Sequence, residues 1–497
     1  MSCYIMAIDQ GTSSSWAIIF DEGAKPIASS QRQVRQTFPK PGWVEQDPRD
    51  IWGSVVEVFR DSLSKAGLFP SDISAIGITN QRETTILWDR QTGEPVYNAI
   101  VWQSRQSAHI CQEIKDSGFE PELRRKTGLL ADPYFSGTKI AWILRNVEGA
   151  KELMMQGRLM FGTVDTWLSY KLTGGKRHIT DQSNASRTLL FDINCLRWDE
   201  GLCGMLGISP SVLPDVNESC GNLAITSEDV IGARIPITGL AGDQQSALFG
   251  QLCIKQGDVK STYGTGSFML MNTGGSPFFS SNGLITTVAW SIAGRTTYAL
   301  EGSIFVAGSA IQWIRDGLGI VETSAESETL AMGLQSNEGV YFVPAFVGLG
   351  TPYWNQEARG TITGITRGTT KAHIARAALE SIAYQTMDVL NSMKADCHIE
   401  PATLKVDGGM VANGFLMGFL ADIAGIEVIR PKFQETTALG AAFLAGIGIS
   451  HWKGIEDLAD CWQQDHTFKP SMTSEEAKRL YFGWKRCIRA SLAACSE

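Results

Sequence analysis

Asp-Gln-Gly-Thr-Ser-Ser-Ser, at residues 9–15, stands between two apolar runs, Tyr4–Ile8 and Trp16–Phe20. An apolar run, a small-residue turn and a second apolar run predict a β-hairpin with a short loop. The turn is unusual because it offers hydroxyl groups beside backbone N–H groups, and both can hold phosphate oxygens. The hydroxyls belong to Thr12, Ser13 and Ser14. The stretch therefore predicts either a phosphate-binding hairpin or an ordinary polar turn between two buried strands.

Asp9, at the end of the first predicted strand, is a candidate metal residue. Mg²⁺ prefers oxygen ligands and releases its bound waters reluctantly, so a single carboxylate can hold it through water. The hairpin therefore also predicts that Asp9 helps to place a Mg²⁺ ion through water.

The size and composition of the chain favour a multidomain globular protein. A length of 497 residues exceeds what one hydrophobic core usually supports, so we expect at least two domains. Hydrophobic residues make up 43% and charged residues 19%, as in ordinary globular proteins. The net charge of −9 argues against nucleic acid or an anionic membrane surface as a partner.

The ten cysteines indicate a reducing environment, because they form no Cys-x-x-Cys pair and no Cys/His cluster at zinc spacing. The N-terminus shows no charged-then-apolar signal, since Asp9 interrupts its first apolar run. The longest apolar segment, residues 438–449, is too short to span a membrane and contains three glycines. We therefore expect a cytoplasmic protein without membrane insertion, in which residues 438–449 form a buried helix.

Strand-like runs alternate with helical stretches along the chain, which favours an α/β fold. Residues 75–79 and 84–88 are predicted to be buried strands with a turn between them. Residues 371–395 lack proline and glycine and carry apolar side chains on one helical face. A shorter helix is expected over residues 415–423, with Gly425 as its C-cap.

The segment Lys260–Met271 is a partial echo of the opening hairpin. It again reads as a short strand, a Gly-Thr-Gly turn and an apolar strand. Two such units suggest two related domains that face each other, although a glycine-rich chain could produce the likeness by chance. The boundary that fits best lies near Gly250, which gives domains 1–250 and 251–497.

A carboxylate is the best candidate for a catalytic base. The six histidines have no evident partners, and the chain lacks a Walker-type phosphate loop and a His-Glu-x-x-His motif. Asp243 follows an apolar strand and a glycine, and it precedes a small-residue helix. This position suits either a general base within reach of a substrate hydroxyl or a simple helix N-cap.

Arg82 and Glu83 lie between two predicted strands. A guanidinium donates hydrogen bonds and a carboxylate accepts them, so the pair could bind the two hydroxyls of a vicinal diol. Opposite charges in a surface turn are also commonplace, and both interpretations stay open.

Aromatic residues and glycines mark further candidate contacts. Trp102, Tyr134 and Phe268 flank polar loops, where they could be core residues or could pack against the C–H faces of a small polyol. The pair Gly408-Gly409 follows a strand and precedes a helix. Such a pair lets a flat ligand such as adenine approach the backbone, although an ordinary βα turn has the same pattern.

Taken in order, these motifs resemble the FGGY carbohydrate kinases, and within them the members that act on glycerol. The likeness runs nearly from end to end, and the Asn-Gln-Arg-Glu-Thr segment is its most distinctive part. Its main motifs are Asp9-Gln-Gly-Thr, Gly77-Ile-Thr-Asn-Gln-Arg-Glu-Thr-Thr, Asp132-Pro-Tyr-Phe-Ser-Gly-Thr-Lys, Gly242-Asp-Gln-Gln, Thr262-Tyr-Gly-Thr-Gly, Val406-Asp-Gly-Gly and Thr437-Ala-Leu-Gly-Ala-Ala.

The resemblance implies two actin/hexokinase-like (ribonuclease H-like) ATPase domains that flank a deep cleft. It implies phosphate transfer from ATP to a terminal hydroxyl of glycerol, with Asp243 as the base and Asp9 placing Mg²⁺. The implied glycerol contacts are Arg82, Glu83, Trp102, Tyr134, Asp243, Gln244 and Phe268. The implied nucleotide contacts are Thr12, Ser13, Ser14, Thr265, Gly308, Gln312, Gly409 and Asn413. It also implies a homodimer or homotetramer.

Two departures from the family pattern bear on function. Relatives carry arginine where this chain has Trp16, and tryptophan cannot supply the charge that clamps phosphate oxygens. We therefore expect weaker catalysis or a compensating cation nearby. Bacterial relatives inhibited by fructose 1,6-bisphosphate have a glycine- and lysine-rich loop, whereas the residues before Arg234 include Glu228 and Asp229. Acidic side chains would repel the bisphosphate, so we do not expect this inhibition.

Two alternatives to a glycerol-directed kinase follow from the same residues. One is a kinase for another small polyol or sugar, such as erythritol or xylulose. The other is a catalytically weak ATP-binding sensor or scaffold, which the presence of Trp16 in place of arginine would favour. Retention of both Asp9 and Asp243 argues against a scaffold, because a scaffold needs neither carboxylate.

Overall fold

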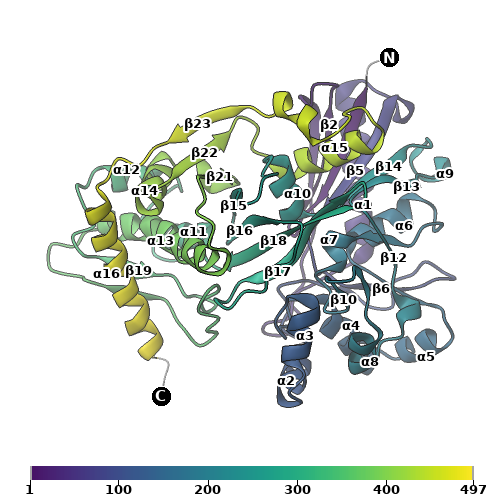
Figure 1. Ribbon diagram of the computed structural model, residues 1–497, viewed down its shortest axis with the longest axis horizontal. Coiled ribbons are helices and arrows are strands. Elements are labelled where there is room, and N and C mark those ends of the chain that lie inside the picture. The colour runs from purple at the N-terminus through teal and green to yellow at the C-terminus, as the bar shows by residue number, and fades with distance from the viewer. Residues whose placement is uncertain (1–2, 495–497) are drawn as a thin grey trace.

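The structure is a computed structural model that describes residues 3–494 and contains two large mixed β-sheets (Figure 1). Strands from the first half of the chain form a six-stranded sheet, in the spatial order β13 (Cys220–Ile225), β14 (Pro236–Gly242), β5 (Ile73–Asn80), β1 (Tyr4–Gln10), β2 (Ser14–Phe20) and β3 (Pro26–Gln33). Strands from the second half form a seven-stranded sheet, in the order β17 (Ile285–Ile292), β18 (Arg295–Ile304), β16 (Ser267–Gly274), β15 (Val259–Tyr263), β21 (Thr403–Asp407), β22 (Glu427–Pro431) and β23 (Gln464–Phe468).

The two sheets repeat one arrangement around a central hairpin. In the first sheet, β1 pairs antiparallel with β2 and parallel with β5. In the second, β15 pairs antiparallel with β16 and parallel with β21. An antiparallel strand closes each sheet beyond its parallel strands, β13 in the first and β23 in the second. Both predicted hairpins and the predicted α/β class are therefore confirmed.

Helices cover both sheets, and several short strands lie outside them. The helices are α1 (Pro48–Ala66), α2 (Ala108–Asp116), α3 (Glu120–Thr127), α4 (Ser136–Asn146), α5 (Ala150–Met155), α6 (Val164–Leu172), α7 (Gln182–Ala185), α8 (Glu200–Leu206), α9 (Glu228–Ile231), α10 (Asp243–Gly250), α11 (Gly308–Asp316), α12 (Glu326–Met332), α13 (Lys371–Cys397), α14 (Gly414–Ala424), α15 (Thr436–Gly448) and α16 (Ser474–Ala493). The short paired strands are β4 (Glu45–Gln46) with β7 (Ala99–Ile100), β6 (Ile86–Asp89) with β8 (Leu159–Gly162), β9 (Ile179–Asp181) with β12 (Asp215–Asn217), β10 (Phe191–Asp192) with β11 (Arg197–Trp198), and β19 (Tyr341–Val343) with β20 (Thr361–Thr363).

The predicted elements are found close to their expected positions. The strand predicted at 75–79 is β5, and the helices predicted at 371–395, 415–423 and 438–449 are α13, α14 and α15. Gly425 ends α14 with a φ of 68° and donates its N–H to Ala421. The strand predicted at 84–88 begins later, as β6, and it pairs with β8 in a separate small sheet. The chain therefore leaves the six-stranded sheet after β5, which places Arg82 and Glu83 between two sheets.

Helix α15 belongs to the second half of the sequence but packs against the six-stranded sheet. It contacts β1, β5, β13 and β14, and Figure 1 shows it in yellow-green beside the purple N-terminal strands. Glycines allow this close approach, because a Cβ atom on Gly77 would lie 2.1 Å from the carbonyl oxygen of Ala441. On the other side of the helix, a Cβ atom on Gly440 would lie 1.9 Å from the carbonyl oxygen of Ser246 in α10. This contact joins the two halves of the molecule at α10, the helix that begins with Asp243.

Each sheet has its own apolar core. Side chains of α1 and α6 pack against the six-stranded sheet, and the buried residues include Ile8, Val55 and Leu168. Helix α13 packs against β16 and β18 of the seven-stranded sheet, where Leu300 and Leu379 are buried. The polar ends of strands from both sheets lie between these cores, and the candidate site is there.

Candidate functional site

The first hairpin presents its hydroxyl residues at the tip of a tight turn. The N–H of Gly11 donates to the carbonyl of Ser14 at 2.9 Å, which closes the turn. Ser13 is exposed, whereas the hydroxyl of Ser14 is buried and accepts a hydrogen bond from Gln31 at 3.0 Å. Thr12 precedes Ser13, and its hydroxyl accepts a bond from Nε1 of Trp102 at 2.9 Å. The turn thus leaves polar groups available at its tip while its base is held by protein contacts.

The second hairpin lies against the start of α11. Thr265, at the exposed tip of this hairpin, accepts hydrogen bonds at its carbonyl from the N–H groups of Ala307 and Ser309, at 2.9 and 3.1 Å. Gly308 is required between them, since a Cβ atom there would lie 2.6 Å from the carbonyl of Gly264. Gln312, one turn later in α11, is exposed. The structure therefore brings Thr265, Gly308 and Gln312 into one region.

The Gly-Gly turn after β21 lies beside the same hairpin. Gly408 has a φ of +87°, and a Cβ atom there would lie 2.6 Å from the carbonyl of Tyr263 at the end of β15. Gly409 is exposed, and nothing lies within 4 Å of the position that its Cβ would take. Asn413 is the N-cap of α14, where its side-chain oxygen accepts the N–H of Leu416 at 2.8 Å. An open backbone at Gly409 fits a flat ligand that lies along this turn.

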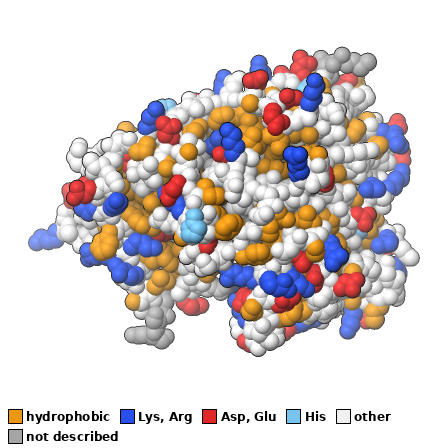
Figure 2. Space-filling view, viewed as in Figure 1, with side chains coloured by type: hydrophobic (Ala, Val, Ile, Leu, Met, Phe, Trp, Pro, Cys, Tyr) orange, Lys and Arg blue, Asp and Glu red, His pale blue; other side chains and the backbone are white. Residues whose placement is uncertain are grey.

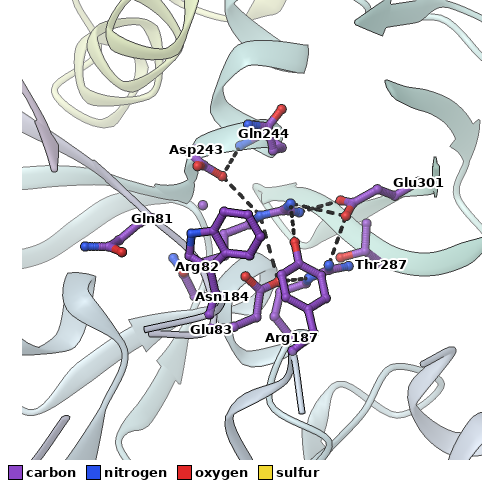
Figure 3. A network of polar contacts seen from close by, with 12 residues as sticks. Gln81, Arg82, Glu83, Asn184, Arg187, Asp243, Gln244, Thr287 and Glu301 are labelled. Carbon is purple, nitrogen blue, oxygen red and sulfur yellow. Dashed lines mark hydrogen bonds and ion pairs between the residues drawn. The ribbon is translucent and has the colours of Figure 1, made fainter. Parts of the chain in front are cut away.

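Arg82 is the centre of a buried network of charged groups (Figure 3). Its Nε lies 3.0 Å from Oδ1 of Asp243, and one terminal nitrogen donates to the hydroxyl of Tyr134 at 3.3 Å. Both terminal nitrogens bind the carboxylate of Glu301, which comes from β18 of the other sheet. Because only 3% of Arg82 is exposed, the surface-turn interpretation of this segment is wrong.

Glu83 is held in an unusual backbone conformation beside Arg82. Its φ of +61° lies in the left-handed region, where a side chain with a Cβ is disfavoured. Its carbonyl accepts hydrogen bonds from Ser136 at 3.0 Å and Lys139 at 3.3 Å, and its carboxylate accepts one from Nε of Arg187 at 2.6 Å. Strain that so many contacts maintain is typical of a residue placed for function.

Three aromatic rings meet beside the charged network. The ring centroids of Trp102 and Tyr134 lie 5.5 Å apart, and those of Trp102 and Phe268 lie 5.8 Å apart. The guanidinium of Arg82 lies 5.8 Å from the centroid of Phe268. Phe268 belongs to β16, so the second sheet supplies one wall of this aromatic cage. Since Trp102 also binds Thr12, one side chain contacts both the cage and the first hairpin.

Asp243 is the first residue of α10, and Gly242 is the N-cap, so the helix-cap interpretation of Asp243 is wrong. The Asp243 carboxylate accepts the N–H of Gln244 at 2.6 Å and is about a quarter exposed, at 27%. Burial raises its pKa, while the charges of Arg82 and Lys260 act in the opposite direction. A partly enclosed carboxylate with a raised pKa is a suitable general base.

Gln244 connects this carboxylate to a buried cation that sequence analysis missed. Nζ of Lys260 donates to the side-chain oxygen of Gln244 at 2.5 Å and to the hydroxyl of Thr262 at 2.9 Å. Burial lowers the pKa of Lys260 to about 8, and the charges of Asp407 and Asp243 oppose that shift. The second hairpin therefore carries a cation next to the proposed base.

Arg187 and Glu301 were also missed by sequence analysis. Both are fully buried, and they bind each other at 2.9 Å. The sequence does hold a signal for Glu301, because it is a lone carboxylate within the apolar strand Tyr298–Ile304. Such a charge requires a buried partner. Arg187 gives no comparable signal, since the fold alone brings it to Glu83.

Asp9 meets the chemical requirements of a water-mediated Mg²⁺ contact. Burial raises its pKa well above the ordinary value, and the negative charges of Asp243 and Glu435 raise it further. A cation placed among these carboxylates would relieve their repulsion, and oxygen is the ligand that Mg²⁺ prefers. Within residues 3–494, no group of three or more His, Cys, Asp or Glu side chains could hold a metal directly. The donor set therefore fits a hydrated cation.

Trp16 lies directly opposite Asp9 in the β1–β2 ladder. Side chains of opposed residues in an antiparallel pair point to the same face, so the indole lies on the same face as the carboxylate. Trp16 is half-buried and packs against the apolar cluster that includes Ile18 and Phe443. An arginine at this position would place its charge beside Asp9, which gives the predicted deficit a structural basis.

Figure 2 shows Lys and Arg side chains interspersed with Asp and Glu over the face in view. Among the helices within residues 3–494, none is long and apolar enough to cross a membrane.

Two family models match the chain in succession. The N-terminal domain of the FGGY family of carbohydrate kinases matches residues 4–250, and the C-terminal domain of that family matches residues 259–449. Two bacterial proteins match at high identity. Glycerol kinase 2 of Thermotoga maritima is 56% identical over 489 residues, covering 98% of this chain and 99% of its own. Glycerol kinase of Bacillus subtilis is 55% identical over 494 residues, covering 99% and 100%.

A solved structure extends this likeness to the fold. The crystal structure of Plasmodium falciparum glycerol kinase with ADP is 37% identical to this chain and superposes with a TM-score of 0.92. The match covers 99% of this chain and 98% of the other.

Proposed function

This chain belongs to the FGGY family of carbohydrate kinases, and we propose on that premise that it transfers the γ-phosphate of ATP to a terminal hydroxyl of glycerol. The products are glycerol 3-phosphate and ADP. One observation carries the choice of substrate. The donor Arg82 lies 3.0 Å from Asp243 and 4.0 Å from the acceptor Glu83, and three aromatic rings meet beside them, which suits a small diol with a short carbon chain.

In the proposed mechanism, Asp243 accepts the proton of the attacking hydroxyl as the phosphoryl group moves. Nε of Arg82 lies 3.0 Å from Asp243, so a hydroxyl bound to the carboxylate would also meet this nitrogen. Glu83 accepts a bond from the neighbouring hydroxyl, while Trp102 and Phe268 cover the carbon chain. Phosphoryl transfer depends mainly on such positioning and on charge stabilisation, so it requires little of the base.

The nucleotide is proposed to lie between the two hairpins and the Gly-Gly turn. Thr12, Ser13 and Thr265 would hold its phosphates, whereas the buried hydroxyl of Ser14, which binds Gln31, would support the turn. Gly308, Gln312, Gly409 and Asn413 would hold the rest of the nucleotide. Asp9 would hold hydrated Mg²⁺, which neutralises phosphate charge when bound. Lys260 adds a protein cation next to Asp243, which matters because Trp16 supplies none.

We also propose that residues 1–250 and 251–497 act as two domains that close over a deep cleft. Closure would exclude water, which could otherwise accept the phosphate. The proposal is supported by the two separate sheets and by the contributions of both halves to the cage. The contact of α15 with the six-stranded sheet would then lie where the domains are joined.

We also propose a cellular location and an oligomeric state. The cysteines of the described part of the chain carry free thiols, in keeping with a reducing cytoplasm. The family resemblance also suggests a homodimer or homotetramer. Sedimentation or light scattering of the purified protein would test the oligomeric state.

The best test is a coupled assay of ADP release with Mg-ATP and a panel of polyols. We expect glycerol to give the highest kcat/KM, with erythritol, xylitol and xylulose far lower, because the Arg82–Glu83 pair and the three rings offer contacts for a small diol. ADP release that does not depend on glycerol would contradict the proposal. A preference for another polyol on the panel would favour the alternative substrate class.

A further inference from the structure

Arg82 is held on three sides by protein groups. One terminal nitrogen binds Gln245 at 3.3 Å as well as Glu301, and the other binds Tyr134 at 3.3 Å as well as Glu301. These contacts use the N–H groups of both terminal nitrogens, which leaves Nε directed at Asp243. The orientation of the guanidinium is therefore set by groups other than the substrate.

Glu301 contributes most to this orientation. Its two oxygens engage both terminal nitrogens of Arg82, which is the paired geometry that fixes a guanidinium plane. The same carboxylate also accepts a hydrogen bond from Arg187 at 2.9 Å. Although burial opposes ionisation, the charges of Arg187 and Arg82 hold the pKa of Glu301 below its ordinary value. Glu301 is therefore an ionised group shared by two arginines.

Arg187 extends the effect of Glu301 to the other charged residue of the site. Its Nε donates to the carboxylate of Glu83 at 2.6 Å, while another nitrogen binds Glu301. Figure 3 shows the resulting chain of contacts, from Asp243 through Arg82 to Glu301 and back through Arg187 to Glu83. Removing Glu301 would therefore disturb both groups that bind the diol.

The network is poorly suited to a purely stabilising role. Among the described residues, one terminal nitrogen of Arg187 is buried without a hydrogen-bond partner, which costs folding free energy. Buried ion pairs can often be replaced by apolar residues without loss of stability. The arrangement is better explained by the placement of Arg82 and Glu83 than by the stability of the fold.

We propose that Glu301 is a positioning residue for the polyol site, acting from β18 of the second sheet through Arg82 and Arg187. The inference rests on the proposed function. The diol-binding pair comes from the first half of the chain, but it is oriented only when β18 lies against it. The polyol site is therefore incomplete without the second half of the molecule.

The test compares steady-state kinetics of the full-length wild type with those of Glu301→Gln. The variant keeps the shape of the side chain but loses the charge that holds two arginines. We expect the KM for glycerol to rise about 10- to 100-fold, since hydrogen bonds to charged groups are lost. The KM for Mg-ATP should change by a much smaller factor. Circular dichroism and the melting temperature establish that the variant is folded.

Glu380→Gln is the matched control. Glu380 is another buried glutamate of the second half. It binds Arg376 at 2.7 Å and Asn337 at 2.8 Å, and neither partner is one of the polyol residues. The substitution should lower the melting temperature without changing the KM for glycerol. If Glu301→Gln does not fold, Glu301→Asp decides by the same criterion, because it keeps the charge but shortens the reach to the two arginines.

A folded Glu301 variant with an unchanged KM for glycerol would overturn the inference. The inference would also be overturned if Glu301→Gln raised the KM for glycerol and the KM for Mg-ATP by the same factor and Glu380→Gln did the same. Either result with an active wild type leaves the proposed function intact. Failure of the wild type to phosphorylate glycerol would instead overturn the proposed function.

Discussion

Asp243 and Lys260 carry opposite charges at the centre of the site, and each charge opposes the pKa shift that burial causes in the other group. Burial raises the pKa of the carboxyl group, and the nearby ammonium works against that rise. Asp243 can accept a proton only as a carboxylate, so activity should fall as the pH drops through its raised pKa. The acid limb should lie above the ordinary aspartate pKa of 3.8.

Removing the ammonium should move that limb. In Lys260→Met, the loss of a neighbouring positive charge raises the pKa of Asp243 further, so the acid limb of kcat/KM shifts to higher pH. The control is Lys255→Met, which removes an exposed lysine from the same segment. A pH profile of Lys260→Met that coincides with that of the wild type would show that the two charges do not interact.

Trp16 offers a gain-of-function test at the same scale. Trp16→Arg should raise kcat/KM for ATP about 10- to 100-fold, because a guanidinium beside Asp9 can bind phosphate oxygens. Some stability should be lost, since the indole packs against an apolar cluster. Trp16→Leu is the control, because it removes the indole without adding charge. If the arginine variant is no better than the wild type, Trp16 is not a catalytic deficit.

Some residues of the site could be predicted from the sequence, and others could not. Arg82, Glu83 and Asp243 were predictable because each stands where a strand ends, at a position that suits polar groups. Only the structure excludes the surface-turn alternative for Arg82 and Glu83, by their burial, and the helix-cap alternative for Asp243, by the N-cap at Gly242. Glu301 left a weak signal as a charge within an apolar strand, and Arg187 left none. Its role follows from tertiary proximity to Glu83, more than a hundred residues away in the chain.

At the scale of elements, the two halves of the molecule are joined where α15 packs against α10 and the six-stranded sheet. Its apolar, glycine-containing sequence predicted a buried helix correctly. It could not show which sheet the helix would cover, because small residues on every side suit any close neighbour. The reason for the three glycines is visible only in the structure: a Cβ atom on Gly440 would meet α10, one on Gly446 would meet the ring of Trp452, and one on Gly448 would meet β14.

Gly440→Ala tests this packing. The new methyl group would lie 1.9 Å from the carbonyl oxygen of Ser246 in α10, so helices α10 and α15 must move apart. Overpacking of this kind costs about 1–3 kcal/mol or more, and we expect a lower melting temperature together with lower activity. Gly418→Ala is the matched control, because it lies within helix α14 with nothing inside 4 Å of its new methyl group. That control should be neutral or more stable by about 0.4–1 kcal/mol. Equal melting temperatures for the two variants would refute close packing at α15.

At the scale of the whole molecule, two similar sheets contribute different parts to one site. The first half of the chain supplies Asp9, Asp243 and the diol-binding pair, and the second sheet supplies Phe268, Lys260 and Glu301. The echo between the two hairpins predicted this duplication from sequence. It could not predict the asymmetric division of tasks, which depends on how the sheets face each other.

The proposed reaction takes place at the junction of the two sheets, with Asp243 as its base. Phosphorus NMR of Mg-ATP and glycerol with the purified protein tests it most directly. We predict that glycerol 3-phosphate and ADP accumulate in equal amounts, and that folded Asp243→Asn forms neither. The proposed reaction would be contradicted by inorganic phosphate as the sole phosphorus product beside ADP, or by undiminished glycerol 3-phosphate formation in Asp243→Asn.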